Sequence, residues 1–399
     1  MRVVVLGGGY AGLVTTRTLE GTLPSAVDLT LVDETGDHLI QHELHRAIRR
    51  PEFVDRISLP LTDLLDRATV REATVASVDR EDRSVRLADG DAVDYDVVVV
   101  ALGAGTDYRD VPGVAEHALP LKRLPHASRI RREFRGVLDA GGGRAVVAGA
   151  GLSGVQTAGE LAQFARDEGV AGHVEVVLLE AEDRVVPGFP EEFRAAVREE
   201  LDRLDVAVRT GTRVTAAGAD AVEMAGESVD SADAGTLPHG LLVWTGGVRG
   251  PDALDGRRRE VDGTLALDER TFVVGDAARV RDGSGAVVPP SAQAAVRASE
   301  TAANNVAEAV EALRAGREPA FETWTFETPG WLVSVGDGAV AQLGPRTFTG
   351  PTANLIKSAV GVTYLADHGS LADALAVLRE EVEAERDLLD AVRERVGEE

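Results

Sequence analysis

The stretches VVVLGGGYAG (residues 3–12) and AVVAGAGLSG (residues 145–154) share one pattern: an apolar run, then G-x-G-x-x-G, then a helix-forming run. The first glycine of such a motif makes the tight turn out of a strand. The second lets the backbone approach a pyrophosphate, and the third lets the helix pack closely on the strand. The helix N-terminus then favours the negative charge of the pyrophosphate. The two copies predict two dinucleotide sites and electron transfer between them; their glycines are Gly7, Gly9 and Gly12, and Gly149, Gly151 and Gly154.

An acidic residue that closes the next strand is the usual companion of this motif. VDLTLVD (residues 27–33) reads as a strand that ends in Asp33, and VEVVLLE (residues 174–180) as one that ends in Glu180. A carboxylate at this point accepts hydrogen bonds from ribose hydroxyls and repels a 2′-phosphate. The second site is therefore expected to favour NADH over NADPH, although Arg184 is close enough in sequence to weaken the preference. A solvated strand end is the commoner role for either acid alone, but the glycines favour ribose contact.

The charge of the chain is strongly negative. Of 399 residues, 42 are Lys or Arg and 67 are Asp or Glu, so the formal net charge is −25. Such a surface argues against nucleic-acid binding and disfavours anionic lipid surfaces. We attribute the charge to adaptation to high salt, where screening reduces self-repulsion, which is typical of a halophile.

The chain has no cysteine. This excludes a disulfide framework, thiolate metal sites and any redox-active dithiol. The first predicted strand begins almost at Met1, which leaves no room for a signal peptide. No apolar run reaches the roughly 20 residues that span a bilayer. We therefore expect a cytoplasmic protein.

The order of motifs resembles that of the two-dinucleotide-binding-domain flavoproteins, and within them the type II NADH:quinone oxidoreductases. The resemblance extends to about residue 345. Besides the two fingerprints, it rests on VVALGA (99–104), GVAEHALPLK (113–122), VPGFP (186–190), WTGGV (244–248) and VVGDAA (273–278). Each is ordinary alone, but together they are specific.

The resemblance implies an α/β fold with two Rossmann-like domains and a C-terminal α+β region. An FAD domain would comprise residues 1–112 and 240–320, an NADH domain residues 113–239, and a C-terminal domain residues 321–399. Hydride would pass from NADH to FAD and electrons on to a quinone. The expected cofactor contacts are Gly7, Gly9, Tyr10, Ala11, Gly12, Asp33, Ala101, Gly103, Gly275, Asp276 and Ala292 for FAD, and Gly149, Gly151, Gly154 and Glu180 for NADH.

Two side chains are candidates for roles near the reacting rings. Glu160, in GVQTAGEL (154–161), would lie near the nicotinamide, or else form an ion pair on a helix face. Gln293 would begin a helix whose N-terminus points at the flavin. The family pattern A-Q-x-A-x-Q-Q is only half present, because Arg297 and Ala298 replace the paired glutamines. This departure leaves the acceptor open.

Other segments carry coarser expectations. Residues 36–60 are predicted to cross over the first nucleotide as helix and loop. His38, His42 and His45 lie there, but no further ligand is evident, so we expect no metal site. Residues 293–313 read as an Ala-rich helix, 321–345 as β hairpins, and the tail from Leu371 as a charged helix.

Two further functions and two contacts stay open. The chain would also suit an NADH-dependent reductase of a small redox protein such as a ferredoxin, although the negative charge disfavours an acidic partner. A redox sensor of low turnover is the non-enzymatic alternative. A peripheral contact with the cytoplasmic face of the membrane and a homodimer are both compatible with the sequence.

Overall fold

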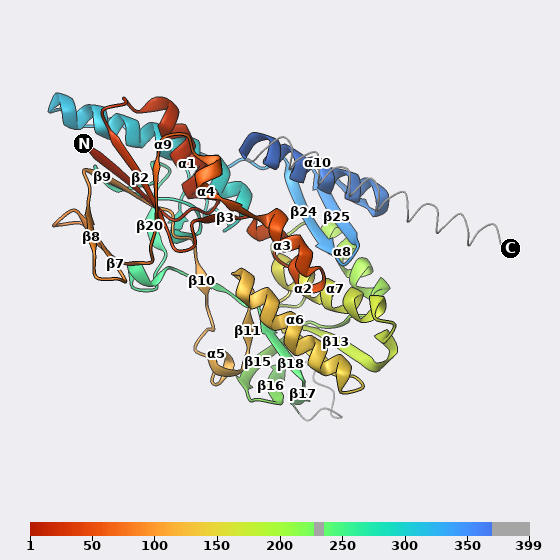
Figure 1. Cartoon of the computed structure of the whole chain (residues 1–399). Helices are drawn as coiled ribbons and strands as arrows, with labels where there is room; N and C mark the ends of the chain where they lie inside the picture. The colour runs from red at the N-terminus through yellow and green to blue at the C-terminus, as the bar shows by residue number, and fades with distance from the viewer. Residues whose placement is uncertain (227–234, 369–399) are drawn as a thin grey trace.

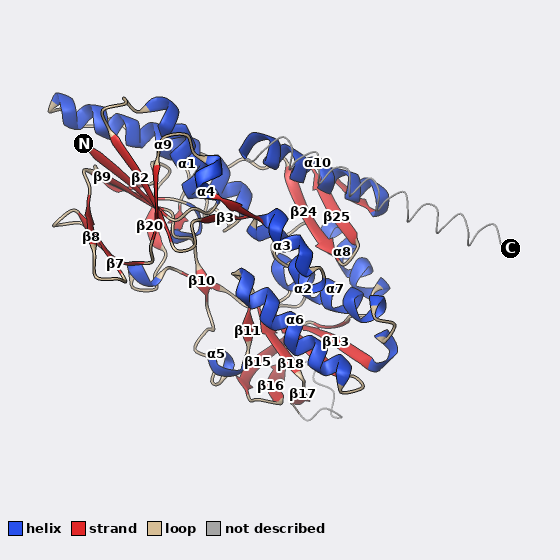
Figure 2. Cartoon of the chain, in the orientation of Figure 1, coloured by secondary structure: helices blue, strands red, loops and turns tan. Residues whose placement is uncertain are grey.

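Two mainly parallel sheets organise the protein, for which a computed structural model describes residues 1–226 and 235–368 (Figure 1). The first sheet lies in the lobe that contains the N-terminus, and the second lies in a separate lobe with α6 and β13. Each sheet carries one of the glycine-rich loops. The predicted α/β class is confirmed (Figure 2).

The first sheet has the strand order β21-β22-β9-β1-β2-β5, and only β21 runs antiparallel to its neighbour. Its β9 strand is four valines, all buried, as expected for a parallel strand that is covered on both faces. Helices α1 and α9 pack against each other beside this sheet. The bounds are β1 Arg2–Leu6, α1 Tyr10–Thr22, β2 Asp28–Asp33, β5 Thr69–Glu72, β9 Val97–Val100, β21 Ala266–Asp268, β22 Thr271–Val273 and α9 Ala292–Ala315.

The second sheet repeats this plan with the order β11-β18-β12-β13-β14, all parallel. Helix α6 packs on β12 and β18, and α7 packs on β12 and β13. The bounds are β11 Leu119–Pro120, α6 Leu124–Asp139, β12 Gly143–Ala148, α7 Leu152–Asp167, β13 Val174–Leu179, α8 Glu191–Arg203, β14 Ala207–Arg209 and β18 Leu241–Trp244.

The position of β18 corrects the predicted domain boundary at residue 240. This strand pairs with β12 in the second sheet, just as β9 pairs with β1 in the first. The second lobe therefore extends to Trp244. Directly after it, β19 (Val248–Arg249) pairs with β10 (Gly105–Thr106), so the chain enters and leaves the second lobe side by side.

Small sheets complete both lobes. In the first, they comprise β6 Val75–Asp79, β7 Ser84–Leu87 and β8 Ala92–Asp94, and a parallel pair of β20 Arg259–Val261 and β23 Ala278–Val280. In the second, they are β15 Thr212–Ala217, β16 Ala221–Gly226 and β17 Thr236–Pro238, with α5 Val114–His117 nearby.

Residues 36–60 leave the first sheet and reach the second lobe. A helix and loop were expected here, and the short helices α2 (Arg46–Arg49) and α3 (Val54–Ile57) are present. The paired strands β3 (Asp37–Leu39) and β4 (Ser58–Pro60) were not predicted, because three residues are too few to show an alternating pattern. Helix α2 packs against α6 and α7. After β4, α4 (Leu61–Leu64) leads back to the first sheet.

The C-terminal part is a three-stranded sheet with one helix. It consists of β24 (Gly330–Val335), β25 (Gly338–Leu343), β26 (Arg346–Thr349) and α10 (Gly350–His368). The expected hairpin is present as β24 and β25, but residues 321–329 form no strand. Instead, the Trp324 amide donates to the Gly263 carbonyl of the first lobe. The predicted tail helix from Leu371 lies outside the described residues.

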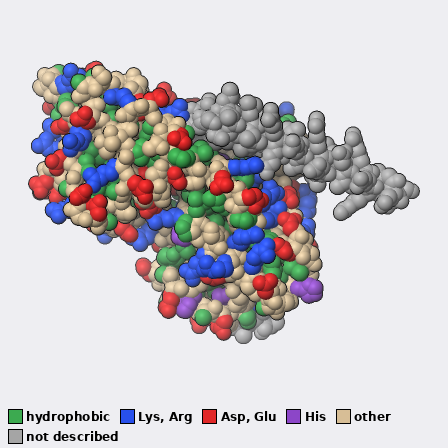
Figure 3. Space-filling model, viewed as in Figure 1, with side chains coloured by type: hydrophobic (Ala, Val, Ile, Leu, Met, Phe, Trp, Pro, Cys, Tyr) green, Lys and Arg blue, Asp and Glu red, His purple; other side chains and the backbone are tan. Residues whose placement is uncertain are grey.

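Opposite charges are interspersed on the face that Figure 3 shows. Within residues 1–226 and 235–368, no helix is both long enough and apolar enough to cross a bilayer.

Candidate dinucleotide sites

The first and third glycines of each fingerprint are required by backbone geometry. Gly7 has φ of +98° and Gly149 of +106°, a region that side chains disfavour. A Cβ on Gly12 would lie 1.7 Å from the Gly7 oxygen, and one on Gly154 would lie 1.8 Å from the Gly149 oxygen. The first turn of each helix therefore rests directly on the loop that precedes it.

The second glycines face open space. A Cβ on Gly9 or Gly151 would meet nothing within 4 Å, so the backbone is accessible on this side. Helices α1 and α7 begin immediately afterwards, without a side-chain cap and without an acidic residue in the first turn. At both N-termini, no capping side chain or first-turn carboxylate competes with a bound anion. Both loops fit a pyrophosphate.

Asp33 and Glu180 brace these loops. Asp33 Oδ2 accepts a hydrogen bond of 2.7 Å from the Gly8 amide, and Glu180 Oε2 accepts one of 2.7 Å from the Ala150 amide. Gly8 and Ala150 are the middle residues of the two G-x-G turns. These two hydrogen bonds were not predicted. The sequence signal that could have indicated them is the equivalent position of Asp33 and Glu180, one after each motif. Ribose contact stays a prediction.

The remaining FAD candidates converge beside the first loop. A Cβ on Gly7 would lie 2.5 Å from the Ala101 oxygen, and one on Gly275 would lie 3.0 Å from Ala11 Cβ. Gly275, with φ of +66°, opens the turn that carries Asp276. The structure thus brings residues from three distant parts of the sequence to one edge of the first sheet. Gly103, two residues after Ala101, has φ of +67°.

Two cations lie near Asp276. Arg258 Nε donates to the Asp276 backbone oxygen at 2.8 Å. Burial lowers the pKa of Lys122, and the Asp276 carboxylate opposes that shift. Lys122 closes the GVAEHALPLK segment, so the entry to the second lobe lies beside the predicted FAD site.

Two of the three histidines in residues 36–60, His38 and His42, contact the first fingerprint directly. His38 Nδ1 lies 2.9 Å from the Gly8 oxygen, and His42 Nδ1 lies 2.5 Å from the Tyr10 hydroxyl. Tyr10 is the first residue of α1, so the start of residues 36–60 lies alongside the loop. That this segment crosses over the first nucleotide stays a prediction. In the described part of the chain, no group of three acidic or histidine side chains is arranged around a common point for a metal.

Glu160 is an ion-pair partner in this structure. Its side chain is 1% exposed and its Oε2 accepts a hydrogen bond of 2.8 Å from Arg49 Nε. Burial raises the pKa of Glu160, and the Arg49 charge opposes the rise. Of the two predicted roles, this geometry favours the ion pair over a place beside the nicotinamide.

The N-terminus of α9 carries Ala292 and Gln293. Ser291 caps it by accepting from the Ala294 amide at 3.1 Å, and Thr328 Oγ1 donates to Gln293 Oε1 at 2.9 Å. The residues that replace the family glutamines differ: Arg297 is exposed, and Ala298 is buried in the first core. Ala298 is therefore a packing residue on α9.

The buried imidazole of His45 is expected to make the folded protein less stable in acid. It is 3% exposed, its Nε2 has no hydrogen-bond partner, and burial lowers its pKa from 6.5 to about 3. The unfolded chain binds a proton at this residue between these pH values and the folded chain does not, so stability falls as pH drops below 6.5. Between pH 6.5 and pH 5 the loss is about 2 kcal/mol. Urea unfolding at the two pH values measures it.

His45→Leu should reduce this acid loss, whereas His173→Leu, at an exposed histidine, should leave it unchanged. An equal loss in the His45→Leu variant would contradict the assignment. Glu43 acts in the same direction at lower pH. Burial would raise its pKa, but Lys357 and Arg46 outweigh burial and hold it well below its usual value.

Comparison with known proteins identifies the family. The model of the pyridine nucleotide-disulphide oxidoreductases matches residues 1–299. The chain belongs to this family. It has no cysteine, so this chain forms no redox-active disulfide of its own. The prediction of a two-domain oxidoreductase is confirmed.

Curated relatives and solved structures extend this result. Demethylphylloquinone reductase NdbB of Synechocystis is 27% identical over 76% of this chain and 78% of its own. The type II NADH:quinone oxidoreductase of Haemophilus influenzae is 27% identical over 76% and 79%. The resemblance stated from the sequence is confirmed by these relatives. The Plasmodium falciparum NDH2 structure in complex with NADH superposes with a TM-score of 0.80 at 15% identity, over 95% and 97% of the two chains, and shows the shared fold.

Proposed function

We propose that the protein is an FAD-dependent NADH dehydrogenase that passes electrons to a quinone. The observation that carries the proposal is the pair of equivalent glycine loops, each followed by a helix without a side-chain cap and each bonded to a bracing carboxylate. Both curated relatives cited above are named as quinone-type reductases, which supports the acceptor class.

The first loop is the proposed FAD site and the second the proposed NADH site. Around the first, Gly275 and Asp276 return from far along the chain to the same sheet edge, which suits a permanently held cofactor. The second sheet is one continuous insertion, which suits a dinucleotide that exchanges. FAD, when bound, supplies the hydride-accepting ring. The protein binds and orients both dinucleotides at its loops.

The absorption spectrum of the purified protein tests this function. We expect flavin bands that bleach on addition of NADH and return with a menaquinone analogue. Recovery with ferredoxin alone would favour the reductase of a small redox protein. Bleaching without recovery by any acceptor would favour the sensor, and a flavin that NADH does not bleach would overturn the proposal.

Glu180→Ala should relax the discrimination against NADPH. The carboxylate is 8% exposed at the end of β13, where it repels a 2′-phosphate. We expect the ratio of kcat/KM for NADH to that for NADPH to fall about tenfold, which corresponds to roughly 1.4 kcal/mol. Because Glu180 also braces Ala150, the KM for NADH should rise.

Glu182→Ala is the matched control. It removes a carboxylate of the same charge two residues away, but its side chain is exposed and only its backbone amide donates to Glu180. Discrimination should stay as in the parent. If Glu180→Ala behaves in the same way as this control, Glu180 does not read the ribose.

A peripheral membrane contact is supported by α10. Leu355 is 62% exposed and Val360 is 52% exposed, and both lie on this helix. Such exposed apolar side chains suit a helix that lies on a lipid surface. The homodimer stays a prediction.

A further inference from the structure

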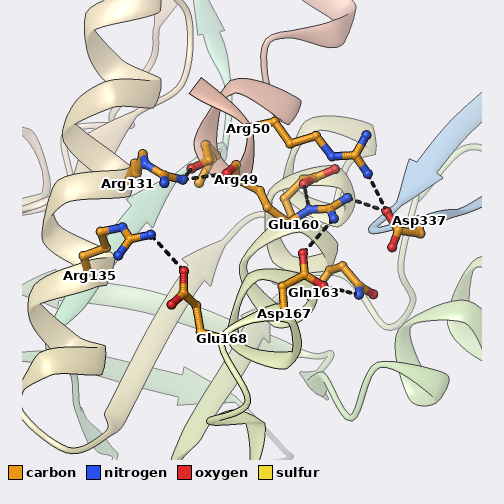
Figure 4. A network of polar contacts seen from close by, with 10 residues as sticks. Arg49, Arg50, Arg131, Arg135, Glu160, Gln163, Asp167, Glu168 and Asp337 are labelled. Carbon is orange, nitrogen blue, oxygen red and sulfur yellow. Dashed lines mark hydrogen bonds and ion pairs between the residues drawn. The ribbon is translucent and has the colours of Figure 1, made fainter. Parts of the chain in front are cut away.

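One buried arginine joins three carboxylates from two elements of the structure. Arg49 lies 2.8 Å from Glu160, 2.9 Å from Asp167 and 2.5 Å from Asp337, and its side chain is 7% exposed (Figure 4). We call these four residues the Arg49 cluster. A guanidinium offers its donors in a rigid fork, which suits several simultaneous carboxylate contacts.

The cluster connects three parts of the protein. Arg49 is the last residue of α2, on the segment that leaves the first sheet after β2. Glu160 and Asp167 are on α7 of the second lobe, and Asp337 lies at the tip between β24 and β25. Neither α7 nor this hairpin belongs to the first sheet. Arg49 therefore forms ion pairs between the segment that leaves the first sheet and elements outside that sheet.

The segment that carries Arg49 is itself held to the first fingerprint. At its start, His38 contacts the Gly8 oxygen, and His42 contacts the Tyr10 hydroxyl. Further along the segment, Arg131 of α6 donates to the backbone oxygen of Arg49 at 2.6 Å. The segment thus contacts both the predicted FAD loop and α6 of the second lobe.

On the other side, α7 begins at the second fingerprint. Glu160 is eight residues after Leu152, about 12 Å along the same helix. Next to it, Gly159 allows the hairpin to approach, because a Cβ there would lie 2.6 Å from the Gly336 amide nitrogen. A contact at Glu160 therefore holds the helix whose N-terminus forms the predicted NADH site.

We propose that Arg49 is a positioning residue, which fixes α7 relative to the first sheet so that the two dinucleotide sites face each other at hydride-transfer distance. The proposal rests on the proposed function. Reacting atoms must come within about 3–3.5 Å, and a misplacement of 1 Å can cost about 100-fold in rate. Without Arg49, the buried Glu160 would lose its hydrogen-bonded counterion and keep only the more distant charges of Lys357 and Arg46, while Asp337 would keep Arg50.

The geometry is tested without activity by a distance measurement. The chain has no cysteine, so Glu199→Cys on α8 and Glu300→Cys on α9 place two spin labels, one in each lobe, at exposed sites. Pulsed electron resonance on the FAD-loaded protein should give one narrow distance distribution. Arg49→Ala in this background should broaden or shift it.

Arg135→Ala is the matched control. Arg135 of α6 pairs with Glu168 at the end of α7 at 2.8 Å, but its side chain is 45% exposed (Figure 4). Its loss should leave the distribution unchanged. If Arg49→Ala does not fold, Asp337→Asn removes the charge that pairs with Arg49 and Arg50, at a side chain that is 54% exposed, and is expected to broaden the distribution less.

Flavin reduction by saturating NADH gives the second readout. Stopped-flow measurement should show a rate constant about 10- to 100-fold lower for Arg49→Ala, intermediate for Arg49→Lys, and unchanged for Arg135→Ala. The dissociation constant for NADH should be unchanged, because no cluster residue lies in the second loop. A folded Arg49→Ala variant with the parent distances and rate would overturn the proposal. If the parent flavin is not reduced at all, the proposed function fails, and the distances still decide the role of Arg49.

Discussion

Gly154→Ala is expected to give a protein that retains FAD but whose flavin is no longer reduced by NADH. The added Cβ would lie 1.8 Å from the Gly149 oxygen and 2.8 Å from Thr245 Oγ1. Helix α7 must then move away from the loop, and its N-terminal N–H groups no longer converge on a pyrophosphate. The first sheet is not touched by this substitution. The measurement is the flavin spectrum before and after addition of NADH.

Gly136→Ala is the control for adding a methyl group to a helix of the same lobe. Nothing lies within 4 Å of a Cβ at this position of α6. Alanine is favoured over glycine in a helix by about 1 kcal/mol, so the variant should be slightly more stable and fully reducible. Normal bleaching in the Gly154→Ala variant would contradict the assignment of NADH to the second loop.

Gly12→Ala is expected to give a protein that is purified without FAD and with reduced stability. Here the Cβ would lie 1.7 Å from the Gly7 oxygen and 3.4 Å from Ala101 Cβ, in the core of the first lobe. Overpacking of a core typically costs about 1–3 kcal/mol, and loss of a bound cofactor lowers stability further. Flavin content per protein and the thermal midpoint measure the two effects.

The two glycine variants together decide which loop holds which dinucleotide. Gly21→Ala, at an exposed point of α1 with nothing within 4 Å, should keep its flavin and so serves as the control for the first lobe. If Gly12→Ala keeps FAD while Gly154→Ala loses it, the proposed assignment is reversed. The similarity of the loops makes this test necessary, because their backbone geometry alone does not distinguish them.

Local patterns were sufficient for the parts of the fold that repeat a motif. The apolar runs before Gly7 and Gly149 are β1 and β12. The strand predicted to end in Asp33 is β2, and the strand predicted to end in Glu180 is β13, which ends one residue earlier. These predictions succeeded because a glycine turn, a buried strand and a helix start each leave a short-range signature. The Ala-rich helix succeeded for the same reason and runs Ala292–Ala315.

Predictions that depend on pairing between distant parts of the chain were less successful. Residues 240–320 were assigned to the FAD domain, but β18 belongs to the second sheet, because an apolar strand carries no mark of its partner. The strands β3 and β4 are too short for a pattern to be visible. Trp324 was placed in a hairpin, whereas its backbone pairs with Gly263 across the first lobe.

The sequence by itself indicated two dinucleotide loops. The tight turn after each strand needs glycine for steric reasons, so the pattern G-x-G-x-x-G after an apolar run can be recognised locally. It also indicated the acidic residue that follows each of them. Only the tertiary structure decided that Asp33 and Glu180 brace their own loops, and that Glu160 is held by Arg49, 111 residues earlier. An ion pair between residues far apart in the sequence depends on how the lobes pack against each other. No local sequence pattern encodes that packing.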